Sequence, residues 1–110
     1  MYFIRLMKLA NASKLDLNLL RVFLAIWEQR SLTAAGARLE LTQPAVSHAL
    51  RRLRELFDDP LFVRTANVMT PTEAATRLHG PIDQALGIVN RAMHDHGAFD
   101  PATAKRIFRV

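Results

Sequence analysis

The residues of this sequence best suited to chemistry with another molecule lie on the polar face of one predicted helix. The helix lies within the stretch LTQPAVSHALRRLREL, residues 41–56. At 100° per residue, Ser47, His48 and Arg51 lie opposite an apolar stripe that consists of Val46, Leu50, Leu53 and Phe57. Arg52 also lies outside this stripe. Hydroxyl, imidazole and guanidinium groups on one exposed face are suited to binding a polar, anionic partner.

The same residue types form no recognisable catalytic or metal site. Ser47 and His48 are adjacent, but no third group orients the imidazole, and the chain has no glycine-rich phosphate loop. His94 and His96 are two residues apart, so a helix would point them to different faces, and the chain has no cysteine to assist them. We therefore predict no enzyme activity, no metal ligand and no cofactor for this chain.

The composition favours one small domain, or one domain with an appendage, that binds an acidic partner. The chain has 110 residues, a formal net charge of +5 and no cysteine. A basic balance favours nucleic acid or a membrane surface, although charge alone fits a merely basic domain equally well. The lack of cysteine excludes disulfides and fits a reducing cytoplasm. No apolar run approaches the roughly 20 residues of a membrane span, so no membrane partner is predicted.

Three short helices are predicted to position the polar face, at residues 17–30, 32–40 and 43–57. Asp16, Ser31 and Thr42 are the predicted N-caps, because their side-chain oxygens can accept hydrogen bonds from the first helical amides. Pro44 fits the first turn of the third helix, where its missing N–H does no harm.

Small and large apolar residues have separate predicted roles in these helices. Trp27 continues the apolar stripe of the first helix and is predicted to be in the core. The second helix has small side chains that allow another helix to approach closely, namely Ala34, Ala35 and Ala37.

A hairpin and a long helix are predicted after Asp59-Pro60, which ends the third helix. The predicted strands are residues 61–64 and 67–70, with the turn at residues 66–67. Thr70 and Glu73 are predicted to form a capping box, with Pro71 at the first helical position.

The long helix contains an apolar seam at coiled-coil-like spacing, formed by Leu78, Ile82, Leu86, Val89 and Met93. We predict that this seam pairs with a second copy of the chain, and the alternative is that it packs on its own domain. Gly80-Pro81 is predicted to interrupt and kink the helix, with His79 packed near the kink and Gly97 at the helix end.

Two short helices joined by a tight turn, the second with a basic outer face, indicate a helix-turn-helix. One helix fits the major groove of B-DNA, where glutamine and arginine read base edges. Gln43, Ser47, His48 and Arg51 fit that role. The hairpin would then be the wing, with Arg64 near an adjacent minor groove. The alternative for the third helix is an ordinary solvated face.

Several motifs resemble the amino-terminal DNA-binding region of LysR-type transcriptional regulators. They are LDLNLLRVF, SLTAAGARLELTQPAVSHALRRLRELFDDPLFVRT and MTPTEAA, in the same order and at the same spacing. The resemblance covers residues 15–110. LDLNLL, DDPLFVRT and FDPATAKRIFRV are similar to the branch that contains the nodulation regulators and the aromatic-acid-responsive activators.

The resemblance implies roles for individual residues in binding double-stranded DNA. The resemblance places Gln43, Pro44, Ser47 and His48 at bases, and the polar face of the helix adds Arg51. The resemblance places Ser31, Thr33 and Thr42 near phosphates and Arg64 in the wing, and we also expect Arg52 and Thr65 at phosphates or in the wing. His48 departs from the family pattern, because several relatives have arginine there. Histidine is shorter and mostly neutral at pH 7, which puts a direct base contact by His48 in doubt.

The resemblance also implies a mainly α, winged helix-turn-helix fold at residues 14–70, followed by a linker helix at 71–96 that pairs between subunits. Residues 1–13 are expected to be a flexible leader. Residues 97–110, which include RIFRV, are expected to be a hinge and the first strand of a truncated effector-binding domain. The expected protein is a cytoplasmic, homodimeric regulator that is tetrameric at full length, with a small-molecule co-inducer bound only by the missing domain.

Two other classes of function are compatible with parts of the sequence. One is a helical protein–protein module in which the apolar seam binds another chain. The other is an amphipathic membrane binder, which is disfavoured because the basic residues are spread over several elements. DNA binding is distinguished by an affinity that falls steeply and linearly with the logarithm of salt concentration.

Overall fold

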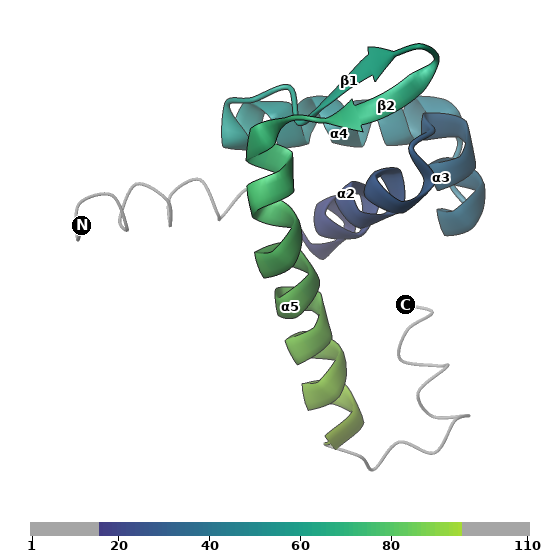
Figure 1. Cartoon of the computed structure of the whole chain (residues 1–110). Coiled ribbons are helices and arrows are strands. Elements are labelled where there is room, and N and C mark those ends of the chain that lie inside the picture. Colours follow the sequence, from purple (N-terminus) through teal and green to yellow (C-terminus); the bar gives the residue numbers. More distant parts are fainter. Residues whose placement is uncertain (1–15, 96–110) are drawn as a thin grey trace.

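A computed structural model describes residues 16–95 and has the mainly helical fold expected from the sequence (Figure 1). The helices are α2 (Leu17–Gln29), α3 (Leu32–Leu39), α4 (Gln43–Phe57) and α5 (Glu73–Asp95). The hairpin consists of β1 (Phe62–Thr65) and β2 (Val68–Pro71). The predicted leader, and the predicted hinge and strand at 97–110, lie outside the described residues.

The three predicted N-caps are confirmed at the starts of α2, α3 and α4. Asp16 Oδ1 accepts a hydrogen bond from the Leu19 amide at 3.0 Å. Ser31 Oγ accepts from the Ala34 amide at 3.1 Å, and Thr42 Oγ1 accepts from the Ala45 amide at 3.2 Å. These short polar side chains satisfy amides that would otherwise lack a partner, so the helix starts are local properties of the sequence.

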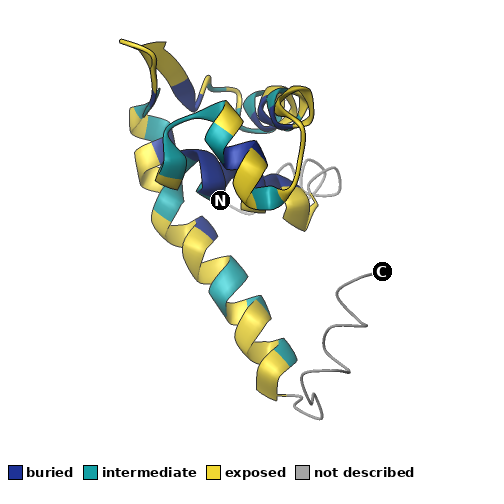
Figure 2. Ribbon diagram, turned by 90° about the vertical axis from the view of Figure 1, so that its right-hand side faces the viewer, coloured by how far each residue is buried: buried dark blue, intermediate teal, exposed yellow. Residues whose placement is uncertain are grey.

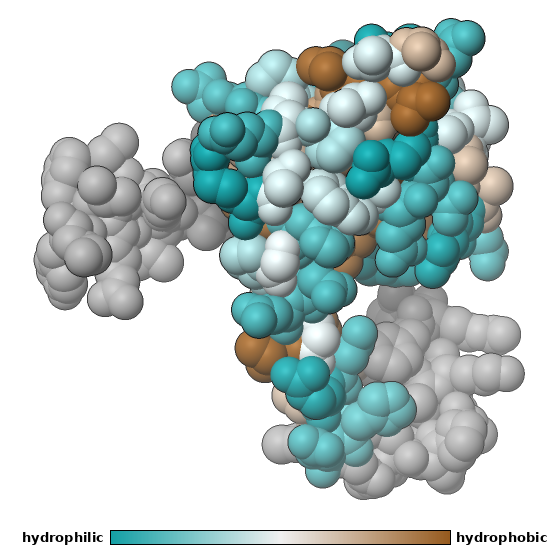
Figure 3. All heavy atoms as spheres, in the orientation of Figure 1, coloured by the Kyte–Doolittle hydropathy of each residue, from teal (hydrophilic) through white to brown (hydrophobic). Residues whose placement is uncertain are grey.

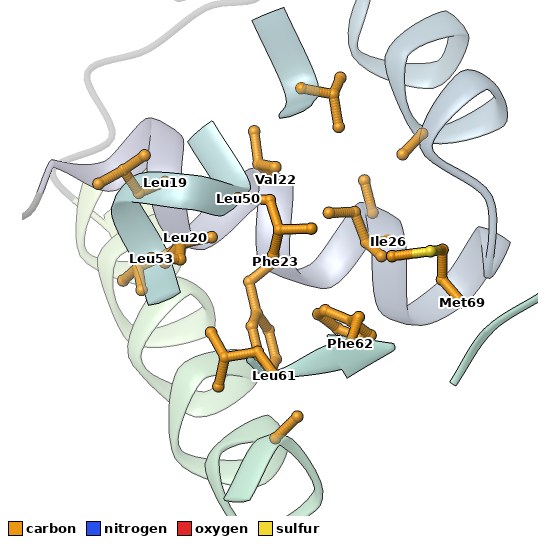
Figure 4. Packing of buried hydrophobic residues seen from close by; sticks show 14 of the residues in the cluster. Leu19, Leu20, Val22, Phe23, Ile26, Leu50, Leu53, Leu61, Phe62 and Met69 are labelled. Carbon is orange, nitrogen blue, oxygen red and sulfur yellow. The ribbon is translucent and has the colours of Figure 1, made fainter. Parts of the chain in front are cut away.

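One hydrophobic core joins the helices to the base of the hairpin (Figure 4). Phe23 of α2 lies in its centre, with its ring centroid 5.3 Å from that of Phe62 of β1. From α4, the stripe residues Val46, Leu50 and Leu53 are buried as predicted. Phe57, in the last turn of α4, is only half-buried.

Trp27 lies at the edge of this core and not within it. Its ring is half-buried and stacks on the ring of His79, with 4.1 Å between centroids and 16° between planes. The Arg30 guanidinium carbon lies 4.9 Å from the centre of the Trp27 ring. His79 therefore packs α5 against the last turns of α2.

The hairpin has the predicted two-residue turn, but each strand begins one residue later than expected. Ala66 and Asn67 both have positive φ angles, of 52° and 66°, as a type I′ turn requires. Leu61 also has a positive φ, of 64°, and donates its amide to Asp59 Oδ2 at 2.8 Å. This bend occupies Leu61, so pairing starts at Phe62, which lies opposite Pro71.

The predicted capping box at Thr70 and Glu73 is wrong. Thr70 pairs with Val63 in the hairpin, and Pro71 is the last residue of β2. Thr72 caps α5 instead, because its Oγ1 accepts a hydrogen bond from the Ala75 amide at 3.2 Å. Because Thr70 is paired within the hairpin, it cannot cap the helix, and Thr72 is the N-cap in its place.

The predicted interruption at Gly80-Pro81 is also wrong, because α5 continues through Pro81 without a break. Proline removes one helical hydrogen bond, and it disfavours helical backbone at the preceding residue partly through that residue's Cβ. Gly80 has no Cβ, which removes part of the clash and helps the helix to continue. From this point toward its C-terminal end, α5 is largely exposed (Figure 2).

Part of the apolar seam of α5 faces its own domain, which corrects the prediction that all five residues pair with a second copy. Ile82 is only 6% exposed and belongs to the core, while Leu78 and Leu86 are half-buried against it. Val89 and Met93 lie further along the helix, where Ile88 is 57% exposed. A role in pairing therefore stays a prediction for Val89 and Met93.

Candidate nucleic-acid interface

A close contact at Gly36 sets the geometry of the turn that presents α4. The Leu41 amide donates a hydrogen bond to the Gly36 carbonyl at 2.8 Å. A Cβ at position 36 would lie 2.7 Å from the Leu41 carbonyl oxygen and 3.2 Å from Val46 Cγ2. Sequence reasoning assigned close approach to the three neighbouring alanines and missed Gly36. An isolated glycine inside a helical pattern was the available signal.

The residues predicted to approach bases lie together along the start of α4. Gln43, Pro44, His48 and Arg51 are exposed, and Ser47 is half-buried. Gln43 Nε2 donates to Ser47 Oγ at 3.0 Å. Arg51 Nη2 lies 2.7 Å from His48 Nδ1. Side-chain hydrogen bonds therefore link the polar residues of this face in two pairs, each within one helical turn.

The hydroxyl groups predicted at phosphates lie at the starts of α3 and α4. Ser31 and Thr42 use their side-chain oxygens as N-caps, which leaves each hydroxyl proton free to donate to an anion. Thr33 is exposed in the first turn of α3. Arg52 is exposed on α4 and lines a groove that this helix forms with α2.

The two predicted wing residues, Arg64 and Thr65, are both exposed in β1. Successive strand residues point to opposite faces, so these side chains leave the hairpin on different sides. Arg64 is paired with Met69, on the face that includes the buried end of the hairpin. Thr65 is on the outer face, where Val63 and Val68 are 42% and 43% exposed. Apolar atoms are visible at the hairpin in Figure 3.

Arg54 supports the wing, and sequence reasoning assigned it no role. Its guanidinium donates two hydrogen bonds, from Nε to the Pro60 carbonyl at 2.7 Å and from Nη2 to the Phe62 carbonyl at 2.7 Å. A basic residue in the last turn of a helix can reach carbonyl groups beyond the helix end, which was the signal available. The β2 strand is held separately, because the Met69 amide donates to the Arg30 carbonyl at 2.9 Å.

Asp59 joins the end of α4, the start of the hairpin and the start of α5. Its Oδ2 accepts from the Thr72 hydroxyl at 2.7 Å and from the Leu61 amide at 2.8 Å. The Thr72 hydrogen bond, followed by that of the Leu61 amide, lowers the pKa of the Asp59 carboxyl; burial opposes them, and the charge of Arg77 adds the smallest lowering. Asp59 therefore stays ionised and holds the junction at neutral pH.

The polar face and the wing carry positive charge that other side chains of residues 16–95 do not neutralise. The ion pairs in this part of the chain are Arg38–Glu28, at 3.0 Å, and Arg77–Glu73, at 2.6 Å. Arg51, Arg52 and Arg64 belong to neither pair. The described residues contain no group of three histidine, cysteine, aspartate or glutamate side chains that could hold a metal ion. None of the described helices is long and apolar enough to cross a membrane.

The sequence from the start of α2 to the start of α5 matches a known family. The model of the bacterial regulatory helix-turn-helix proteins of the lysR family matches residues 17–76, which is more than half of the chain. This chain belongs to the LysR family. The described residues thus form the winged helix-turn-helix DNA-binding domain of a LysR-type transcriptional regulator.

Relatives of this chain include a transcriptional activator and a nodulation protein. The chain is 47% identical over 96 residues to the HTH-type transcriptional activator NahR of Pseudomonas putida, covering 87% of this chain and 32% of NahR. It is 43% identical over 96 residues to nodulation protein D 1 of Bradyrhizobium elkanii, covering 87% of this chain and 31% of that protein. The chain spans about a third of the length of these curated relatives.

A solved LysR-type structure shows the same fold in contact with DNA. The chain is similar to the DNA-binding domain of BenM in its crystal structure with benA site 1 DNA, with a TM-score of 0.68 and 25% sequence identity. The match covers 84% of this chain and 96% of that chain. The likeness therefore extends over nearly the whole of the BenM domain.

Proposed function

We propose that this LysR-type domain binds a specific operator by placing the start of α4 in the major groove. The observation that carries this proposal is the polar face of α4, where Gln43, Ser47, His48 and Arg51 lie together, and where the arginines form no ion pair with the other described residues. This face combines donors and acceptors that can read base edges with charge that attracts phosphates.

Each polar group of the face fits a distinct contact in the groove. A glutamine amide suits adenine, and an arginine guanidinium suits the two acceptors of guanine. Ser47 can donate or accept, and Pro44 would contact bases through apolar atoms. The hydroxyls at the starts of α3 and α4, from Ser31, Thr33 and Thr42, and the exposed guanidinium of Arg52 would contact phosphates.

The wing would contact DNA beside α4. The exposed side chain of Arg64 suits a narrow minor groove, where the negative potential is enhanced. Thr65 would bind the adjacent phosphate backbone of the DNA through its hydroxyl group. The hydrogen bonds of Arg54 support this role, because they attach the first strand of the wing to α4 and so fix its distance from the reading helix.

We further propose that two copies bind a dyad operator in the bacterial cytoplasm, joined through the outer half of α5. Ile88 is 57% exposed there, and Val89 and Met93 lie within one and a half turns of it. Apolar side chains on an exposed helix gain stability when a second helix covers them. Two linked domains also bind two half-sites more tightly than one domain binds a single half-site.

Selection of DNA from a random library by the purified chain tests the proposal. We expect enrichment of a dyad with half-sites spaced by about one helical turn or a multiple of it. We also expect affinity for the enriched sequence to fall linearly with the logarithm of salt concentration. Failure to enrich any sequence, together with weak salt dependence, would favour a protein–protein module instead.

A further inference from the structure

His48 and Arg51 form a side-chain pair on the exposed face of α4 in which only one protonation state of His48 fits. Arg51 Nη2 lies 2.7 Å from His48 Nδ1. A guanidinium group has donors only, so Nδ1 must be the acceptor and the imidazole must be neutral, with its hydrogen on Nε2. Protonation of His48 would place a hydrogen on Nδ1 and a positive charge beside the guanidinium.

We infer that His48 is a positioning residue for Arg51, and that its protonation weakens base selection by α4. This inference rests on the proposed function, in which α4 reads bases. An exposed arginine has many rotamers, and a bond to a neighbour one turn away reduces their number before DNA binds. Two-pronged recognition of guanine depends on the orientation of the guanidinium, so losing the bond affects selection more than general attraction to DNA.

Protonation of His48 would change both the charge of the surface that attracts DNA and the position of the Arg51 side chain. His48 lines a groove between α2 and α4 that is also lined by Asp16, the N-cap of α2, by Arg21 of α2 and by Arg52 of α4. The neighbouring α3 contributes only the apolar Leu39 to this groove. Arg51 contacts His48 directly, and Arg21, Arg52 and Asp16 line the same groove, so a charged His48 adds to a surface with more positive than negative groups.

Two effects of opposite sign follow from protonation of His48. A further cation on the DNA-facing surface increases affinity for any DNA through the phosphates. Release of Arg51 decreases the preference for the operator over random DNA. Protonation of His48 is therefore expected to raise affinity for random DNA and to lower operator preference together.

The test measures the dissociation constants for the selected operator and for a random duplex between pH 5.5 and 8.0 at constant ionic strength. We define the operator preference as the ratio of the dissociation constant for random DNA to that for the operator. From pH 8.0 to pH 5.5, we expect this ratio to fall roughly five- to tenfold for the unmodified chain, which is less than the full discrimination that one two-pronged base contact provides. Its affinity for random DNA should rise over the same range. Circular dichroism at each pH verifies that the domain stays folded.

Four variants separate positioning by His48 from other pH effects. His48→Gln retains an acceptor for Arg51 but cannot become charged, so its operator preference should not change with pH, whatever its value at pH 8.0. His48→Ala lacks the acceptor and should have a low, pH-independent preference. Arg51→Ala should also have a low preference that does not change with pH. His79→Gln, whose parent ring stacks on Trp27, should behave like the unmodified chain.

The outcomes distinguish this inference from the proposed function. If Arg51→Ala lowers the operator preference but the unmodified chain and His48→Gln have the same pH profile, the positioning role of His48 is wrong and base reading stands. If Arg51→Ala and Gln43→Ala both leave the operator preference unchanged at pH 8.0, base reading by α4 is wrong and the inference fails with it.

Discussion

Single residues decide how closely α4 can be held against the rest of the domain. Gly36 is the clearest case, because the backbone of Leu41 occupies the space that a side chain at position 36 would need. The Leu41 backbone cannot easily move away, because its amide donates a hydrogen bond to the Gly36 carbonyl. The tight turn before α4 therefore depends on the absence of one Cβ.

We expect Gly36→Ala to lower the free energy of unfolding by about 1–3 kcal/mol, the usual cost of overpacking. Urea denaturation measures the change. Gly87→Ala is the matched control, because its Cβ would lie 3.5 Å from Arg91 Nη1, an ordinary contact. This control should gain about 0.5–1 kcal/mol from the higher helix propensity of alanine. Equal stability of the two variants would show that the turn relaxes freely.

Gln43 and Ser47 share a hydrogen bond on the reading face, so their contributions to DNA binding should be coupled. We expect Gln43→Ala and Ser47→Ala each to weaken operator binding by about 1–3 kcal/mol and to leave random DNA largely unaffected. The double variant should lose less than the sum of the two. Gel-shift titrations measure all three, and equal loss on operator and random DNA would exclude base reading by this pair.

At the scale of elements, the junction around Asp59 connects the reading helix, the wing and α5. One carboxylate oxygen accepts hydrogen bonds from both Leu61, which directly precedes β1, and Thr72, which directly follows β2. The hairpin is short, and a two-stranded ribbon has little stability by itself. Its position therefore depends on this carboxylate and on the bonds from Arg54.

The lowered pKa of Asp59 predicts acid sensitivity of this junction. A carboxyl whose folded pKa is depressed contributes stability above its ordinary value of 3.8, and this contribution is lost as pH falls through the lower folded pKa. We expect the melting temperature to fall more between pH 5 and pH 2 for the unmodified chain than for Asp59→Asn. Parallel pH profiles of the two proteins would show that the Asp59 charge adds no stability.

The two halves of α5 should respond differently to the same substitution. Ile82→Asp would bury a charge in the core, which costs several kcal/mol, so we expect this variant to be unfolded or strongly destabilised. Val89→Asp lies in the outer half, where we expect a folded monomer with weaker DNA binding. Circular dichroism and light scattering measure fold and mass, and a dimeric Val89→Asp protein would place the subunit contact elsewhere.

At the scale of the whole molecule, the described chain separates a compact domain from an extended helix. The hairpin, α4 and α3 lie toward one end in Figure 1, and α5 extends away toward the other. The net charge of +5 supports attraction to DNA as a whole, while the arginines of α4 and the wing that form no ion pair within residues 16–95 localise that attraction.

Arg64→Ala tests whether the wing takes part in this attraction. We expect weaker binding and a plot of log affinity against log salt that is shallower by about one unit for the phosphate contact given up. Arg38→Ala removes the same charge from a residue paired with Glu28 at 3.0 Å and should leave the slope nearly unchanged. Equal effects of the two variants would indicate net charge alone and remove the wing from the interface.

The sequence by itself determined the features that depend on neighbouring residues. Helix periodicity identified the buried side of α4, and Asp16, Ser31 and Thr42 were recognised as N-caps because a cap bonds an amide three residues away. The polar face of α4 followed from the same periodicity. These properties depend on local backbone geometry, which a short stretch of sequence specifies.

Only the tertiary structure decided the features that depend on distant residues competing for the same place. Strand pairing took Thr70 from its expected cap and assigned that role to Thr72. Ile82 packs in the core of its own domain, although the seam pattern alone is equally compatible with packing against a second copy. Periodicity shows that a face is apolar, but not which surface covers it, because the hydrophobic effect is non-directional and depends on the apolar area buried.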